Sequence, residues 1–165
     1  MKKFFETLVH KFFLLEKDPS RLAYATCLGI FIGLSPFLGL QTWLAIFFAW
    51  AFGLSIPLVF SVLYLVNNPF FTTIPIVIAN YLTGYLLFTY IITVDVCAHN
   101  PSWFNWIEQK IAPFLFSYLG IQKVCFWYFM VGGVIFAILV TIPLYPVFKY
   151  LYTNLAKKYE NNNTK

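Results

Sequence analysis

Charge is the scarcest feature of this 165-residue sequence, in which 10% of the residues are charged and 61% are apolar. No Asp, Glu, Lys, Arg or His occurs anywhere from Leu22 to Val94. With a mean hydropathy of +0.76, the chain has too little polar material to cover a soluble core. The composition therefore predicts an all-α integral membrane protein and excludes an ordinary soluble domain.

The missing charge also excludes most kinds of chemistry. General acid–base catalysis needs a carboxylate or a histidine, and the uncharged run offers neither. The sequence contains no GxxxxGK phosphate-binding loop, so nothing indicates nucleotide hydrolysis. We therefore predict that the protein is not an enzyme and that it uses no cofactor.

Cysteine and potential metal ligands are equally few. The three cysteines, Cys27, Cys97 and Cys125, have no CxxC spacing, so we predict that no disulfide is required. Asp95, Cys97 and His99 lie close together in the sequence, but three alternate residues lack the fourth ligand of a zinc site. A solvated loop explains them better than a metal site does.

The two ends of the chain carry most of the positive charge. Residues 4–15 have apolar side chains at helical spacing, opposite Glu6, His10 and Lys11. This pattern predicts a cytoplasmic amphipathic helix within residues 1–21 that lies at the membrane surface, with packing on a partner protein as the alternative. Lysine and arginine gather in residues 1–21 and 149–165, whereas residues 95–123 hold Lys110 and Lys123. By the positive-inside rule, both termini are cytoplasmic and residues 95–123 form a periplasmic loop.

The membrane crossings follow from this orientation. Residues 124–148 form a charge-free stretch long enough for a C-terminal transmembrane helix, followed by a cytoplasmic tail at 149–165. Residues 22–94, the membrane core, must then cross an odd number of times if both termini lie on one side. One crossing and three crossings both satisfy this condition.

Two of the prolines in the membrane core directly follow a capping residue. Ser35-Pro36 and Asn68-Pro69 each place a capping residue before a proline, which is typical of a helix start. The apolar residues 22–34 would form a helix of about 20 Å, less than the roughly 30 Å hydrocarbon core of a membrane, and residues 54–66 are equally short. We predict two broken or re-entrant helical segments that form an internal repeat, with breaks near residues 35–42 and 67–69. The alternative is a kink at Pro36 and an ordinary loop between full spans at the second position.

Polar residues cluster at the predicted breaks. A broken backbone is tolerated in a membrane only where protein or a wet cavity satisfies its hydrogen-bonding groups, and helix starts favour anions. We therefore predict a site for an anionic lipid headgroup, such as a polyprenyl phosphate, that is bound or moved across the membrane. The candidate ligand-binding residues are Ser35, Gly39, Gln41, Thr42, Asn67, Asn68 and Thr72.

Two other functions fit the same pattern: a small-solute transporter, and a non-transporting scaffold for a partner such as an envelope glycosyltransferase. The predicted partners are membrane lipids and not nucleic acid, because topology and anionic lipid already explain the terminal lysines. Gly29 and Gly33 form a small-xxx-small pair that predicts close helix packing.

Spaced residues in the first half of the chain form a combined pattern, GxFxGxxPxxGxxT followed by NNP. These are Asp18-Pro19, Ala23, Gly29, Phe31, Gly33, Pro36, Gly39, Gln41, Thr42, Asn67-Asn68-Pro69 and Gly84. The pattern resembles the bacterial Domain of Unknown Function 2062 family over about residues 18–88. The resemblance implies a multi-pass protein of the bacterial inner membrane, and family members fused to glycosyltransferase domains point to lipid-linked sugar pathways. The chain has Gly53-Leu54-Ser55 where relatives often have Arg-Leu-Asn, so no basic residue is implied at that turn.

Overall fold

The computed structural model describes residues 18–37, 39–68, 72–92, 101–104, 109 and 125–163. Within these ranges the chain is helical and contains no strand. The elements are α2 (Pro19–Leu34), α3 (Gln41–Ala51), α4 (Ile56–Val66), α5 (Thr73–Leu86), η1 (Leu87–Ile92), η3 (Ser102–Phe104) and α7 (Phe126–Asn163). Residues 1–17, which hold most of the predicted amphipathic helix, lie outside the described residues. Most of the predicted periplasmic loop, residues 95–123, also lies outside them.

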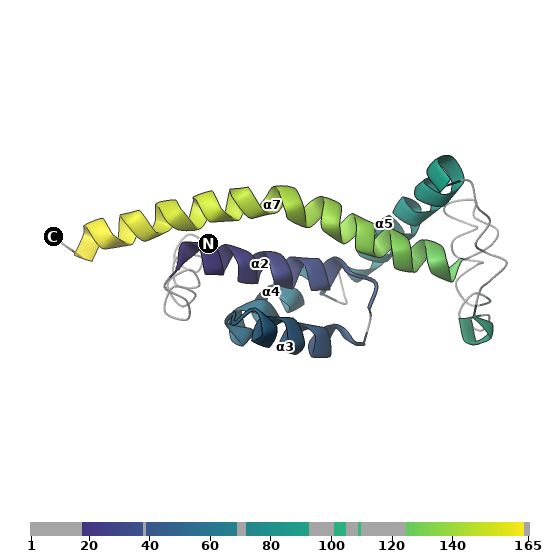
Figure 1. Cartoon of the computed structure of the whole chain (residues 1–165), viewed down its shortest axis with the longest axis horizontal. Helices are drawn as coiled ribbons and strands as arrows, with labels where there is room; N and C mark the ends of the chain where they lie inside the picture. The colour runs from purple at the N-terminus through teal and green to yellow at the C-terminus, as the bar shows by residue number, and fades with distance from the viewer. Residues whose placement is uncertain are drawn as a thin grey trace.

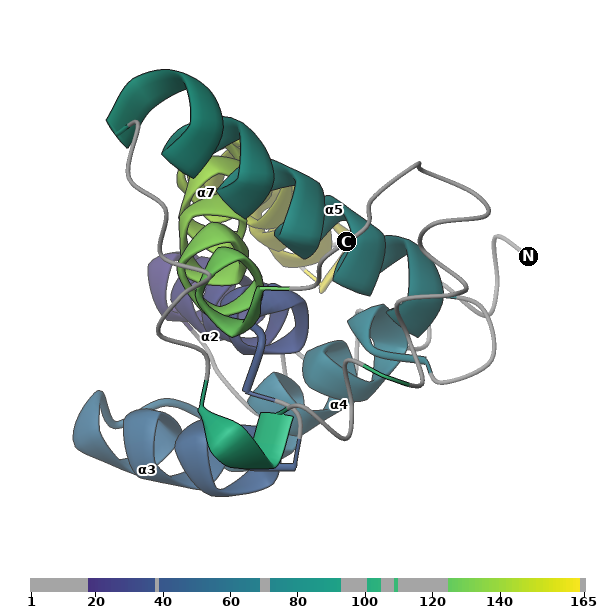
Figure 2. The ribbon, with the colours of Figure 1, turned by 90° about the vertical axis from the view of Figure 1, so that its right-hand side faces the viewer.

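Helix α7 forms the long axis of the molecule, and the other helices pack along it (Figure 1). Helix α2 runs beside one half of α7, with α3 and α4 on the far side of α2. Helix α5 packs against the other half of α7, and Figure 2 shows it on a different side of α7 from α3. The core of buried aliphatic side chains therefore lies between α2, α4 and α7.

Helix α2 begins and ends at residues that the sequence marks. The Asp18 carboxylate accepts a hydrogen bond from the Ser20 backbone N–H at 2.9 Å, and Pro19 stands at the first helical position. At the other end, the Ser35 N–H donates to the Phe31 carbonyl at 3.0 Å, and Ser35 itself is extended with ψ 153. The residue before a proline disfavours the helical conformation, so Pro36 stops the helix.

The described residues 35–37, 39–40 and 67–68 of the predicted breaks are non-helical, whereas Gln41 and Thr42 already belong to α3, and both helix starts lie further along the chain than predicted. Helix α3 begins at Gln41 and not at Pro36, because Gly39 (φ +90) and a bond from the Leu40 N–H to the Phe37 carbonyl form a turn first. The Ser35 hydroxyl caps the end of α2 by donating to the Ile32 carbonyl, so it is not an N-cap.

The second helix start is displaced in the same way. Helix α5 begins at Thr73 with Thr72 at its N-cap position, and Pro69, the predicted start, lies outside the described residues. The N–H groups of Thr72 and Thr73 both donate to the Asn68 carbonyl, at 3.1 and 3.2 Å. These two bonds join the Asn68 carbonyl directly to the start of α5.

The order helix, break, helix occurs twice, as α2 to α3 and as α4 to α5. The packing is not repeated, because α3 contacts α2 and α4 whereas α5 contacts α7. At 11 residues each, α3 and α4 are about 16 Å long, shorter than a membrane core. Two longer elements, Thr73–Ile92 and Phe126–Lys157, are long and apolar enough to cross a membrane.

Small residues allow the helices to approach closely. A Cβ atom on Gly29 would come within 2.8 Å of the Val59 carbonyl oxygen, and one on Gly33 within 3.1 Å of Val66. The predicted Gly29-xxx-Gly33 packing face is therefore confirmed, with α4 as its partner. At the crossing of α5 and α7, a Cβ on Gly84 would collide with the backbone of Tyr128.

Helix α7 extends beyond its predicted end. It runs from Phe126 to Asn163 in one piece of 38 residues, so the stretch after residue 148, predicted as a tail, continues the helix. Pro143 and Pro146 lie inside it, and each removes an N–H from the helix ladder. Proline in a helix interior causes bending, and α7 is curved in Figure 1.

Cys125, directly before α7, is disulfide-bonded, whereas Cys27 in α2 carries a free thiol. The prediction of no disulfide is therefore wrong at Cys125. It relied on local spacing, and disulfides join cysteines that tertiary structure brings within a Cα separation of about 7 Å, whatever their spacing in the sequence. Cys97 lies outside the described residues.

Candidate functional site at the helix breaks

The two breaks meet through their polar side chains. The Asn67 Nδ2 group, at the end of α4, donates to Oε1 of Gln41 at the start of α3. Gln41 in turn donates from Nε2 to the Ser35 carbonyl at the end of α2, at 3.3 Å. A chain of two hydrogen bonds therefore connects the first break to the second. Gln41 and Ser35 are 8% and 2% exposed, so the connection is buried at that end, whereas Asn67 is half-buried.

The second break is held together by two threonines. The Thr73 hydroxyl donates to Asn67 Oδ1 at 3.0 Å. The Thr72 hydroxyl lies within hydrogen-bonding distance of the carbonyls of Val66 and Asn68 and accepts from the Asn68 N–H at 2.8 Å. Carbonyls that the end of α4 leaves without a helical partner are satisfied in this way.

Asn80 completes the arrangement, although it is not among the predicted site residues. It lies in the middle of α5 and is 1% exposed, and its Nδ2 group donates to the Leu34 carbonyl at 3.0 Å. A single amide inside the apolar stretch from Ile74 to Leu86 was the available signal, because a buried amide requires hydrogen-bond partners. We call the set of Ser35, Gln41, Asn67, Asn68, Thr72, Thr73 and Asn80 the polar junction.

The Oδ1 atom of Asn80 is buried and has no hydrogen-bond partner. On the side of α7, a Cβ on Gly133 would lie 3.0 Å from Asn80 Nδ2 and 2.8 Å from Pro36 Cδ. The amide is thus enclosed by the end of α2, Pro36 and α7. An unsatisfied buried acceptor costs about 1–3 kcal/mol, so the polar junction lacks one hydrogen-bond donor.

Helix dipoles at the polar junction offset one another. The C-terminal ends of α2 and α4 and the N-terminal ends of α3 and α5 all lie there. Each N-terminus carries about half a positive charge and each C-terminus about half a negative one. The expected positive potential from two helix starts is therefore balanced, and the unmet hydrogen-bonding need is for a donor.

Five of the seven predicted site residues belong to the polar junction: Ser35, Gln41, Asn67, Asn68 and Thr72. The other two, Gly39 and Thr42, are exposed. Nothing lies within 4 Å of a Cβ placed on Gly39. These two residues therefore flank the polar junction on its outer side.

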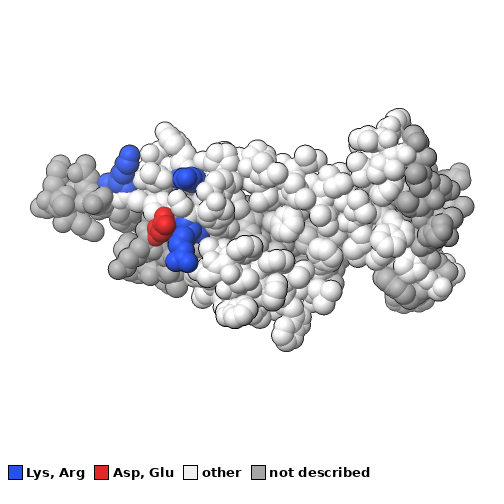
Figure 3. Space-filling model, viewed as in Figure 1, with Lys and Arg blue, Asp and Glu red and all other residues white. Residues whose placement is uncertain are grey.

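Charge is absent from the polar junction. The charged side chains described in the structure are Asp18, Arg21, Lys149 and Lys157, and Figure 3 shows the charged atoms of this face gathered at one end of the molecule. Among the described residues, no group of three or more His, Cys, Asp or Glu side chains could hold a metal ion.

In the part of the chain that the structure describes, these features define an α-helical protein with two helices of membrane-spanning length and a core of shorter apolar helices that are interrupted at a largely buried polar junction. The chain belongs to DUF2062, the family described as an uncharacterized protein conserved in bacteria, whose model matches residues 2–161. No curated protein matches the chain, and no solved structure does.

Proposed function

We propose that this protein is a multi-pass protein of the bacterial inner membrane that binds a phosphate-bearing lipid at the polar junction. In this proposal Thr73–Ile92 and Phe126–Lys157 are the two crossings, which keeps both termini in the cytoplasm. The shorter α2, α3 and α4 enter the membrane without spanning it. Their broken ends are satisfied within the protein, as a membrane requires.

Two observations support this orientation. The described charges lie at one end of the molecule, where Arg21 and the lysines of α7 would face the cytoplasm. Cys125 lies at the opposite end of the apolar part of α7 and is disulfide-bonded, and disulfides persist in oxidising compartments such as the periplasm.

The unsatisfied Oδ1 atom of Asn80 carries the proposal for the ligand. An acceptor needs a donor, so a fully deprotonated phosphate would be repelled there. A phosphate monoester has a second pKa near 6, and a low-dielectric site favours the form with less charge. Its remaining P–OH group can donate to Asn80, and a lipid such as a polyprenyl phosphate carries this group on an apolar chain.

The other side chains of the polar junction would hold the broken backbone and shape the site. Gln41 and Asn67 fix the two breaks against each other, and Thr72 and Thr73 satisfy carbonyls beside them. Their replacement would alter ligand binding through the position of Asn80 and Leu34. Direct recognition would come from Asn80.

A matched pair of lipids tests this proposal. Geranylgeranyl phosphate and its methyl ester both bear a single negative charge near pH 5, but only the first has a P–OH group. We expect the detergent-solubilised protein to bind the monoester about tenfold more tightly. Asn80→Leu should abolish this preference. Asn80→Asp, protonated at its buried position, should keep it. Asn154→Leu, at an exposed position of α7, should leave the preference unchanged.

Equal binding of the two lipids by the unmodified protein would refute the role of the P–OH group. Binding of neither lipid would refute the lipid proposal and favour the scaffold alternative. The preference is a ratio of two affinities for one variant, so partial loss of folded Asn80→Leu protein does not affect it.

A further inference from the structure

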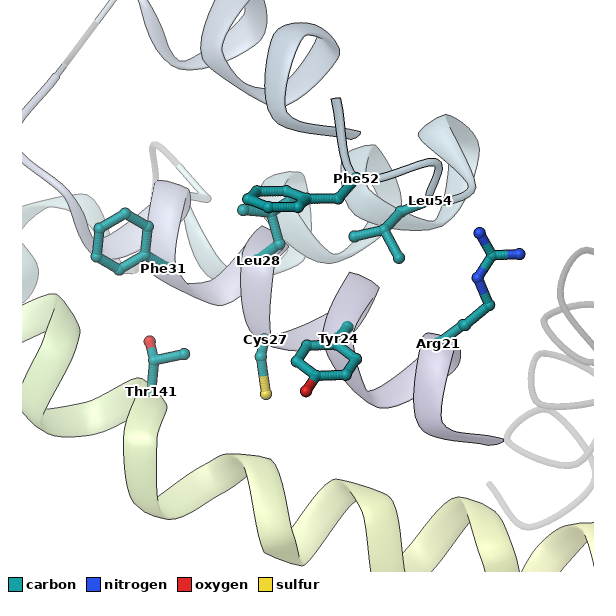
Figure 4. A pocket seen from close by; sticks show the side chains of 8 residues that line it. All are labelled: Arg21, Tyr24, Cys27, Leu28, Phe31, Phe52, Leu54 and Thr141. Atoms are coloured by element: carbon teal, nitrogen blue, oxygen red, sulfur yellow. The ribbon is translucent and has the colours of Figure 1, made fainter. Parts of the chain in front are cut away.

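A groove of about 540 Å³ lies between α2 and α7 and is separate from the polar junction (Figure 4). One face of α2 forms its length, from Arg21 to Phe31, and the turn between α3 and α4 forms a wall with Phe52 and Leu54. Thr141 approaches from α7. Apolar side chains dominate the lining, and the groove has the size of pockets that bury one small-molecule ligand.

Arg21 gives the groove a charged end. Figure 4 shows its guanidinium at the opposite end of the groove from Phe31 and Thr141. The guanidinium is held in place by a bond from Nη2 to the Gly53 carbonyl at 2.8 Å. Gly53 permits this approach, because its φ of +60 suits glycine and a Cβ there would lie 3.2 Å from Nη2. An arginine guanidinium has five N–H donors in a planar fork whose geometry suits a phosphate.

The groove leads from Arg21 towards the polar junction. The lining residues Arg21, Tyr24, Leu28 and Phe31 follow one face of α2, and α2 ends at Leu34, whose carbonyl binds Asn80. At 1.5 Å per residue, Arg21 and Leu34 are about 20 Å apart along the helix. A lipid in the groove would therefore lie along the line that joins the charged end of the molecule to the polar junction.

We propose that this groove is a loading site for a single-chain isoprenoid phosphate, with the phosphate on Arg21 and the chain between α2 and α7. This inference rests on the proposed function and adds the position at which the lipid is first bound. The apolar walls match the chain, and Arg21, the cation among the lining residues, matches the phosphate. The volume suits part of one chain rather than the two chains of a phospholipid.

The test uses the Asn80→Leu protein, in which the preference of the polar junction has been removed. Three ligands are compared: geranylgeranyl phosphate, the neutral alcohol geranylgeraniol, and phosphatidic acid, which carries the same headgroup on two chains. Arg21→Gln should lower the affinity for geranylgeranyl phosphate about tenfold and leave the affinity for the alcohol unchanged. Lys157→Gln removes an equal charge from α7 outside the groove and should change neither affinity.

Filling the groove should weaken the binding of the isoprenoid chain. Leu28→Trp fills part of the space and should lower the affinity for both geranylgeranyl phosphate and geranylgeraniol. In every variant, phosphatidic acid should bind more weakly than geranylgeranyl phosphate. Equal effects of Arg21→Gln and Lys157→Gln would overturn the role of Arg21. Equal affinity for phosphatidic acid would overturn the choice of a single-chain lipid.

The two proposals can fail separately. With Asn80 restored, Arg21→Gln should retain the preference for the phosphate monoester over its methyl ester. If that preference persists while Arg21→Gln has no effect on phosphate affinity, the groove is not the loading site and the polar junction still binds lipid.

Discussion

Gly84 is the position at which a single methyl group should do the most damage. A Cβ there would overlap the carbonyl group and Cα of Tyr128 on α7. Backbone atoms cannot rotate away as a side chain can, so α5 and α7 must separate along their crossing. Overpacking of this kind costs about 1–3 kcal/mol or more, and the better helix propensity of alanine returns about 1 kcal/mol. We expect Gly84→Ala to lower the free energy of unfolding by about 2 kcal/mol.

Gly33→Ala is the matched control, because its Cβ would meet Cγ1 and Cβ of Val66 at 3.1 and 3.2 Å, which a movement of a few tenths of an ångström relieves. Thermal unfolding in detergent should show a Tm about 4–8 °C lower for Gly84→Ala, with a much smaller change for Gly33→Ala. Because Asn80 precedes Gly84 by one helical turn, lipid binding should weaken with stability. Equal Tm values for the two variants would refute the close crossing of α5 and α7.

Three further predictions concern other parts of the molecule. Asn67→Ala should destabilise the protein by about 2 kcal/mol in thermal unfolding, because Gln41 Oε1 and the Thr73 hydroxyl each lose a partner; a change no larger than that of Asn154→Ala would contradict this. Thr141→Val should raise the Tm of the lipid-free protein by about 2–4 °C, because the Thr141 hydroxyl is buried without a partner; a lower Tm would contradict it. A cysteine at exposed Ser102, in a chain whose native cysteines are replaced, should react with a membrane-impermeant maleimide added to intact cells with a permeabilised outer membrane; reaction only after lysis would reverse the topology.

The sequence was sufficient to predict the helical class, the shortness of the apolar helices and the approximate places at which they are interrupted, because these follow from composition, length and proline. Helix starts were harder to predict. Ser35-Pro36 looks like a helix start in isolation, but the same two residues end α2, since a serine hydroxyl can also donate to a helix carbonyl and proline stops the helix before it. Only the turn at Gly39 decides between these roles.

The candidate site was predictable in its polar residues and not in its geometry. Gln41 and Asn67 are far apart in the sequence, and their bond depends on how α3 folds back against α4. Asn80 was missed because it carries no proline or cap signal. The groove was missed because its lining comes from three separate elements, and the residues of α2 in it read as an ordinary apolar helix face.

Lipid mass spectrometry on the purified protein tests most directly whether the polar junction binds a lipid phosphate. The unmodified protein and Asn154→Leu should copurify with a polyprenyl phosphate, and Asn80→Leu and Gln41→Leu should copurify with much less of it, held only by the groove, while retaining their helical circular dichroism. Bulk phospholipid alone, in equal amounts in all four proteins, would contradict the proposal that the polar junction is a lipid-binding site.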